Sequence, residues 1–302
     1  MMRILIASPI KQNIKILNQF LASLSELEVD DFECHYLFVD DCDSQESSDL
    51  LFDFKKHNEN VFIISSTEIV RENFSYTLHE WNNDIIKKVA ELKNYVINIA
   101  KKEEYDYLFL VDSDIVLHRE TLQRLLSVNK DIVSNIFWTK ISKCDDYEPQ
   151  VWLMDQGALF DPSDPKTKSA IYRTVRKAEF ISMLKEKGTY RVGGLGACTL
   201  ISKAVLDAGV NFSKLYNISF WGEDRAFCIR AVAAGFDLYV DTYYPAYHLY
   251  REAYIKGIED YKKDGFSFVL DIEKLSFSDK IKRNLRRIKI SIRCYLYYNF
   301  IK

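Results

Sequence analysis

The chain has 302 residues, of which 48% are hydrophobic and 28% are charged, and its formal net charge is -3. A chain of this length can bury a core sufficient for one large domain or two small ones, and its composition excludes a disordered protein. Its slightly negative charge argues against a protein that binds nucleic acid through overall positive charge, so we expect no nucleic-acid partner.

The sequence shows no sign of export or of a membrane span. Its first residues, MMRILIASPI, lack the long apolar region and the cleavage site of a signal peptide. No uncharged apolar window approaches the roughly 18 residues that a membrane-spanning helix needs. The six cysteines are scattered and include no CxxC pair, which favours reduced thiols over a disulfide framework or a zinc site. We therefore expect a cytoplasmic protein.

The first half of the chain alternates apolar, strand-like runs with segments of helical periodicity. The expected strands are Arg3–Ala7, Phe32–Val39, Val61–Ser65, Tyr107–Val111 and Ile132–Phe137. The expected helices are Ile14–Leu27, Ser44–Lys56 with Ser44 as its cap, and Asn83–Lys102. This order predicts an α/β fold with a doubly wound, mostly parallel sheet. Such a sheet binds its ligand beyond the carboxyl ends of its strands.

The most informative segment is Tyr107–Asp114, YLFLVDSD, in which a strand-like run ends in Asp112 and Asp114. Residues two apart on an extended backbone point to the same side, so the two carboxylates suit an oxygen-binding divalent cation. They would repel each other unless a cation or ligand hydroxyls lay between them. The alternative is a strand followed by a solvated acidic turn or a helix cap.

The distribution of glycine excludes two large classes of nucleotide-binding protein. None of the ten glycines precedes Gly157. The GxGxxG motif and the P-loop both need glycines for close approach of backbone to phosphate, so Rossmann dehydrogenases and P-loop NTPases are excluded. If the first half binds a nucleotide diphosphate, a metal held by Asp112 and Asp114 would neutralise the phosphate charge.

A glycine-rich segment in the second half is a candidate for ligand contact. Arg191–Ser202, RVGGLGACTLIS, has three glycines in four positions. This pattern suggests that a ligand or another strand approaches the backbone closely. A bulged strand without a ligand role is the alternative.

Two acids begin a predicted helix within Phe220–Asp241. Glu223 and Asp224 follow Trp221 and Gly222. Acids in the first turn of a helix commonly interact with its dipole, which accounts for one of them. An aromatic ring such as Trp221 can stack on a sugar, Gly222 lets the backbone approach it, and the other acid can accept a proton from an attacking hydroxyl. We favour Asp224 over Glu223 as this base.

His248, in PAYHLY, follows a predicted strand at Leu238–Val240. A lone histidine is most often structural. The chain after the strand could instead bring His248 back to the ligand edge, where it would be a third metal ligand or a phosphate contact.

Four segments occur in the order seen in GT-A fold glycosyltransferases, and they are ILIASPIKQ, FVDDCDSQES, YLFLVDSD and WGEDRAFCIRA. The chain resembles the family 2 type most closely, including its DxD motif. The resemblance implies a GT-A catalytic domain over residues 1–250, with a nucleotide-binding half at 1–140 and an acceptor half at 141–250. Residues 251–302 would then form a helical extension.

The resemblance also implies roles for individual residues. For the nucleotide and donor it implies Ser8, Pro9, Asp41, Lys93, Asn94 and Asp112. For Mn²⁺ or Mg²⁺ it implies Asp114 as the principal ligand, with Asp112 and His248, and it implies Asp224 as the base of inverting members. To the sugar or acceptor we assign Trp152, Gly193, Gly194, Trp221 and Gly222.

These features predict a metal-dependent, inverting glycosyltransferase of polysaccharide biosynthesis. The donor would be a nucleotide-diphosphate sugar, with UDP the commonest carrier in such enzymes, and the acceptor a carbohydrate, lipid-linked or protein hydroxyl. No QxxRW motif follows Asp224, which argues against the processive synthases. One alternative is a sugar nucleotidyltransferase, which usually carries a glycine-rich N-terminal loop. Another is a catalytically silent sugar-binding scaffold, against which the intact acids argue.

The tail has the pattern of a basic amphipathic helix. One stripe contains Ile281, Leu285, Ile288, Ile292, Tyr295 and Leu296, and away from it lie Lys282, Arg283, Arg286, Arg287, Lys289 and Arg293. Such a helix suits peripheral contact of residues 280–300 with the inner face of an anionic membrane. The alternative is packing on the domain or on a second subunit of a homo-oligomer.

Overall fold

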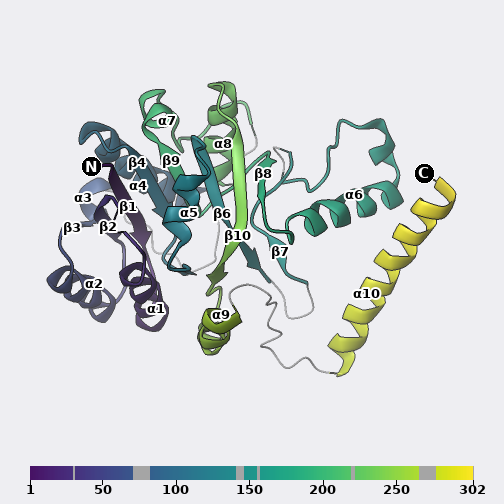
Figure 1. The fold of residues 1–302 in the computed structure, drawn as a ribbon, viewed down its shortest axis with the longest axis horizontal. Helices are drawn as coiled ribbons and strands as arrows, with labels where there is room; N and C mark the ends of the chain where they lie inside the picture. The colour runs from purple at the N-terminus through teal and green to yellow at the C-terminus, as the bar shows by residue number, and fades with distance from the viewer. Residues whose placement is uncertain are drawn as a thin grey trace.

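A computed structural model describes residues 1–29, 31–70, 82–140, 146–154, 157–218, 222–264 and 277–301. One mixed sheet crosses the middle of the molecule (Figure 1). Its strands are β1 (Arg3–Ile10), β2 (Glu33–Asp40), β3 (Val61–Ser65), β4 (Tyr107–Val111), β5 (Ile115–Val116), β6 (Ile132–Thr139), β7 (Glu148–Pro149), β8 (Thr189–Val192), β9 (Cys198–Ser202) and β10 (Leu238–His248).

Helices lie on both faces of this sheet and beyond one of its ends. They are α1 (Ile14–Ser25), α2 (Gln45–His57), α3 (Ser66–Ile69), α4 (Asn83–Lys102), α5 (Thr121–Ser127), α6 (Ala170–Met183), α7 (Lys203–Asp207), α8 (Glu223–Ala233), α9 (Ile258–Asp264) and α10 (Phe277–Leu296). Short 3₁₀ helices span Pro165–Lys168 and Glu252–Gly257, and a π-helical turn spans Tyr297–Ile301. None of the helices within the described ranges is long and apolar enough to cross a bilayer.

The strand order is β3-β2-β1-β4-β9-β6-β10-β5, with β7 beside β6 and β8 beside β10. Strands β1 to β4 pair in parallel, and β10 is parallel to β6. Strand β9 is antiparallel to both of its neighbours, β4 and β6. The predicted α/β fold with a mostly parallel, doubly wound sheet is therefore confirmed.

Alternate residues of the strands supply two hydrophobic layers. Leu5 and Ala7 of β1 pack on the side covered by α4, α7 and α8. Ile4 and Ile6 face the opposite side, which α1, α2 and α5 cover. Because side chains alternate along a strand, a continuous apolar run such as RILIA is what a strand buried on both faces requires.

Most local predictions in the first half match the structure. Helix α4 and strand β3 have the predicted bounds, and the Ser44 hydroxyl caps α2 by accepting a hydrogen bond from the backbone N–H of Ser47. Strand β1 runs three residues further than predicted, so Ser8 and Pro9 lie within it, paired with Phe38 and Val39.

In the second half the predicted elements are found but their ends and pairing differ. The glycine-rich segment divides into β8 and β9 rather than forming one bulged strand. Strand β10 continues from the predicted Leu238–Val240 through to His248. Its pairing with β6 is irregular between Asp241 and Ala246, so the strand bends and still pairs with β5 at its end.

Candidate active site

The two acids that follow β4 are fixed by their backbones to the second half of the chain. The N–H of Asp112 donates to the carbonyl of Ala197 at 2.8 Å, and the N–H of Leu249 donates to the carbonyl of Asp114 at 2.8 Å. Segments from β4, the β8–β9 connection and the end of β10 therefore meet at the carboxyl end of β4. A parallel sheet binds ligands at this edge.

His248 lies beside Asp114, as the sequence hypothesis required. Pairing of β10 with β5 sets His248 opposite Ile115, and its Nε2 is 3.2 Å from Oδ2 of Asp114. Its Nδ1 is 2.7 Å from the Thr139 hydroxyl at the end of β6. The two ring nitrogens thus have separate partners, and the orientation of the imidazole is fixed.

A buried lysine joins the acids of α8 to this edge. The Nζ of Lys93, from α4, lies 2.7 Å from Oε1 of Glu223 and 2.9 Å from Oδ1 of Asp224. The side chain of Lys93 is 2% exposed, whereas that of Asp224 is 29% exposed. Asp224 therefore combines an ion pair on one side with access to solvent on the other.

The charges of this cluster shift one another's pKa values. Burial raises the pKa of Asp112 to about 7, the attraction of Lys93 opposes this, and the charges of Asp114, Asp224 and Glu223 add to it. Burial likewise raises the pKa of Asp224 to about 6, against the lowering effect of Lys93. Burial alone would lower the pKa of Lys93, but the three acids near it hold it well above its usual value.

The connection between β8 and β9 passes close to the side chain of Asp224. A Cβ at Gly196 would lie 2.5 Å from Oδ2 of Asp224. The next residue, Ala197, has a backbone φ of 22°. Residues other than glycine rarely adopt a positive φ. The carbonyl of Ala197 also accepts the hydrogen bond from the N–H of Asp112. A residue with a strained backbone therefore lies between Asp112 and Asp224.

Gly193 and Gly194 allow close packing of another segment of the chain. A Cβ at Gly193 would lie 2.0 Å from the carbonyl oxygen of Leu153, and one at Gly194 would lie 1.9 Å from the indole of Trp152. Trp152 forms an antiparallel bridge with Gly194. Contact with this bridged segment accounts for the two glycines. Trp152 also lines a cavity of about 280 Å³ together with Phe160.

The predicted nucleotide residues of β1 and β2 lie at the other end of the same edge. Asp41 follows β2, and its Oδ1 is 2.6 Å from Nζ of Lys88 and 2.5 Å from the hydroxyl of Ser66. Ser8 is fully buried within β1, and Pro9 is the next residue of that strand. Burial leaves Ser8 without side-chain access to a ligand in this structure.

Three other predicted residues have different outcomes. The side chain of Asn94 bonds to the segment after α7, accepting from the N–H of Phe212 at 2.7 Å and donating to the hydroxyl of Ser213 at 2.9 Å. It therefore does not join the cluster around Lys93. Gly222 is the N-cap residue of α8 and has no atom near its missing Cβ. Trp221 lies outside the described residues.

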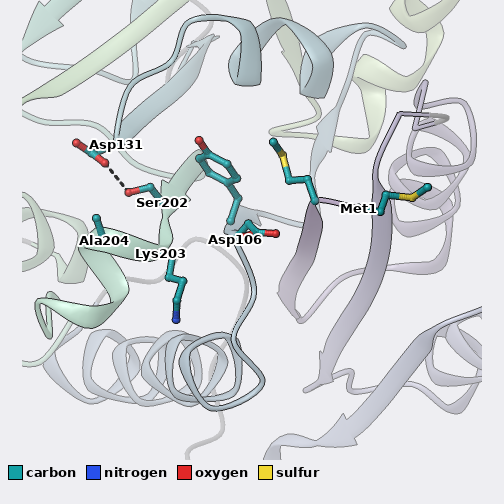
Figure 2. Close-up of a pocket in the computed structure, with 8 residues that line it drawn as sticks. Met1, Asp106, Asp131, Ser202, Lys203 and Ala204 are labelled. Carbon is teal, nitrogen blue, oxygen red and sulfur yellow. Dashed lines mark hydrogen bonds between the residues drawn. The ribbon is translucent and has the colours of Figure 1, made fainter.

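A separate open cavity of about 510 Å³ lies at the opposite edge of the sheet (Figure 2). Met1, Asp106, Asp131 and Lys203 are among the residues that line it. The hydroxyl of Ser202 donates to Asp131 at 2.7 Å. No predicted site residue lines this cavity, and it lies at the amino end of β4, so we assign the chemistry to the other edge.

The donor atoms present fit a divalent cation in part. The carboxylate of Asp114 and the imidazole of His248 converge, and both are groups that bind Mn²⁺. Within the described ranges, however, no group of three or more His, Cys, Asp or Glu side chains is arranged to hold a metal ion. A cation at this edge would therefore need oxygen atoms from a bound ligand.

The sequence hypothesis missed Lys88, Thr139 and Gly196 as contributors to the site. A signal for Lys88 was present, because it falls on the apolar face of α4 beside Ile85 and Leu92, and a lysine buried there requires an acidic partner. Nothing local distinguishes Thr139 from other strand residues. Gly196 belonged to a recognised glycine run, but its contact with Asp224 depends on tertiary structure.

Comparisons with known proteins concern the first half of the chain and the overall fold. Residues 1–144 match the family model described as glycosyltransferase family 25, N-terminal domain. This range includes β1 to β6, Asp41, Lys93 and both acids after β4. A search of curated protein sequences found no match.

Solved structures of S. aureus TarS have a similar fold. TarS residues 1–349 align with a TM-score of 0.50 and 14% identity, over all of this chain and 76% of that one. The same fragment in complex with UDP aligns with a TM-score of 0.50 and 14% identity, over 82% of this chain and 60% of that one. The chain covers 46% of the longer TarS structure. In fold this chain is similar to the GT-A glycosyltransferases, as the motifs indicated, and its first 144 residues resemble the N-terminal domain of glycosyltransferase family 25.

Proposed function

We propose that the chain is a glycosyltransferase that moves a sugar from a nucleotide-diphosphate sugar to an acceptor hydroxyl, with inversion at the anomeric carbon. The observation that carries this proposal is the convergence of Asp114 with His248, and of Lys93 with Asp224, at the carboxyl edge of the sheet. The match of residues 1–144 to a glycosyltransferase model supports the same reaction class.

UDP is the carrier that we propose for the donor. A TarS structure of similar fold contains UDP. In this chain, Asp41 and its partners Lys88 and Ser66 lie after β2 and β3, where an acid can accept hydrogen bonds from the base. A hydrogen bond in which the acceptor is an ionised carboxylate is stronger than one between neutral groups.

Asp114 and His248, with Asp112 beside them, would hold Mn²⁺ or Mg²⁺ together with the donor diphosphate. When bound, the cation would supply Lewis-acid stabilisation of the leaving diphosphate. Thr139 holds the imidazole of His248 in place through Nδ1, which leaves Nε2 directed at Asp114.

Asp224 would act as the general base. It accepts the proton of the acceptor hydroxyl as the oxygen forms its bond to the anomeric carbon, and the bond from that carbon to the diphosphate breaks. Lys93 orients one carboxylate oxygen of Asp224. Gly196 leaves room for the other, Oδ2, next to the loop. Attack from the side opposite the leaving group inverts the configuration.

The test is release of nucleoside diphosphate from a panel of UDP-, GDP- and dTDP-sugars, with Mn²⁺ and with a chelator. We expect one UDP-sugar to be hydrolysed or transferred only when the metal is present. Asp114→Asn and Asp224→Asn should each lower the rate by roughly a hundredfold or more while the far-ultraviolet circular dichroism stays unchanged.

A matched control is Asp207→Asn, which removes an exposed carboxylate of α7 that pairs with Lys203. This variant should keep the wild-type rate. Near-normal turnover by Asp114→Asn would refute the metal role. A product that kept the donor's anomeric configuration would refute the role of Asp224.

A further inference from the structure

Helix α10 has an apolar stripe that is open to solvent. Ile281, Leu285, Ile288, Ile292 and Tyr295 follow one another at spacings of four and three residues, so they share one side of the helix. Their exposed fractions lie between 44% and 62%. Such exposure of five large side chains in one row is uncommon on a protein that stays in water.

The helix is attached to the rest of the molecule by a different side. Arg287 donates to Asp146 through Nε at 3.1 Å, and Arg293 donates to the hydroxyl of Thr174 on α6 at 2.9 Å. Cys294 packs against the cluster formed by Tyr172, Val175 and Tyr297. Figure 1 shows α10 beyond α6, on the side away from β3.

The side of α10 that contacts the protein and the apolar stripe therefore face different directions. Each residue advances by about 100° around a helix, which puts Arg287 and Cys294 roughly 130° from the centre of the stripe. The contacts with α6 hold the helix so that its stripe faces outward.

The charge of the helix indicates what the stripe binds. Phe277–Leu296 contains seven basic residues and one acid, Asp279. Lys282 and Lys289 border the stripe, and the exposed rings of Tyr295 and Phe300 lie at its end. A bilayer with anionic headgroups complements both properties, because aliphatic side chains enter the acyl boundary while lysines meet phosphates.

A second copy of the helix fits less well. The stripe covers only about two heptads, fewer than a stable coiled coil needs. In a paired helix the flanking positions would be Lys282 and Lys289 on one side and Asn284 and Ser291 on the other. No acid would then meet the lysines across the pair.

We propose that α10 lies on the surface of an anionic bilayer, with its stripe inserted at the level of the headgroups, and so holds the protein at the membrane. The inference uses only α10 and its contacts with α6, and it does not depend on the reaction proposed above.

The test is co-sedimentation of the full chain with vesicles of phosphatidylcholine, with and without phosphatidylglycerol. We expect binding to the phosphatidylglycerol vesicles that weakens as salt is raised, because the headgroup charge is screened. The double substitution Leu285→Asp and Ile288→Asp should lower the partition coefficient roughly tenfold or more, since two inserted aliphatic side chains are lost.

The control is Ile14→Asp together with Phe52→Asp. These two residues are also exposed, and the change in net charge is the same, but they lie on α1 and α2. This control should bind as the wild type does. Failure of the wild type to sediment at low salt, or equal loss in both double variants, would overturn the proposal. A different result is a wild type that forms a dimer and does not bind vesicles, with the dimer dissociated by the double substitution Leu285→Asp and Ile288→Asp. That result would show that the stripe binds a second copy of the chain.

Discussion

At the scale of single residues, Lys93 determines the charge balance of the candidate active site. Its ammonium group is buried between Glu223 and Asp224 and also attracts Asp112. The sequence resemblance implied that Lys93 holds the donor. In the structure its hydrogen bonds go to the two acids of α8, so any effect on the donor would act through these carboxylates.

Replacement of Lys93 by Met should destabilise the protein. The substitution leaves Glu223 buried without its cation, and loss of one partner of a buried ion pair costs about 3 to 5 kcal/mol of unfolding free energy. Urea unfolding followed by circular dichroism measures the change. The combined variant Lys93→Met and Glu223→Gln should recover part of it, because a neutral amide then replaces the buried carboxylate of residue 223.

The control for this prediction is Lys56→Met. Lys56 pairs with Asp53 on an exposed face of α2, and exposed pairs contribute little to stability because solvent and salt screen them. Equal losses for Lys56→Met and Lys93→Met would contradict the buried network.

The pH dependence of the rate should report Asp224. Burial raises the pKa of this carboxyl to about 6, and a general base acts only when deprotonated. We expect the rate to rise with pH up to a midpoint near that value and then to level off. Below the midpoint it should fall about tenfold per pH unit. The measurement is kcat/KM for the donor against pH, because this ratio reports the groups of the free protein, and the residual activity of Asp224→Asn should lack this rise.

At the scale of elements, the ends of β6 and β10 position His248. The predicted strand at Leu238–Val240 is real, but the sequence did not indicate that it continues for eight more residues, through Pro245 to His248. Proline normally weakens a strand prediction because it donates no hydrogen bond. The pairing of β10 with β6 is irregular at this point, which accommodates the proline.

Thr139→Val tests this positioning. The substitution nearly preserves shape and removes the hydroxyl that contacts Nδ1 of His248. We expect the Mn²⁺ concentration for half-maximal activity to rise about 10- to 100-fold, as for other residues that orient a metal ligand. The maximal rate at saturating metal should change much less. Thr174→Val, on α6, is the control, and an unchanged metal dependence in Thr139→Val would contradict the role.

Elements with strong local signals could be predicted, and those set by tertiary contacts could not. The helical spacing of apolar residues in α4 and the capping of α2 by Ser44 are determined by residues close together in the sequence. Both are found as predicted. Asp114 and His248 were proposed together, and their contact follows from β5 pairing with β10. By contrast, the burial of Ser8 and the engagement of Asn94 by Phe212 depend on chain segments that pack from far away.

At the scale of the whole molecule, the two halves proposed for the catalytic domain share one sheet. Strand β9, from the second half, lies between β4 and β6 of the first and pairs with both. The first and second halves of the chain are therefore joined through continuous hydrogen bonding as well as through Lys93.

A fragment of residues 1–140 should therefore fail to fold as a unit. Without β9, the facing edges of β4 and β6 have no partner strand, and exposed apolar edges favour aggregation. We expect the fragment to bind a hydrophobic dye and to unfold without a cooperative transition, whereas residues 1–264 should unfold cooperatively. A cooperative, dye-free transition of the short fragment would contradict this.

Helix α4 contributes the lysine of two separate ion pairs, because Lys88 pairs with Asp41 and Lys93 pairs with Asp224. These lysines are five positions apart, which is about 7.5 Å along a helix axis. A helix of this length is stiff, so the backbone positions of Lys88 and Lys93 move together. Any sliding of α4 that moves Lys88 away from Asp41 would therefore also move Lys93 away from Asp224.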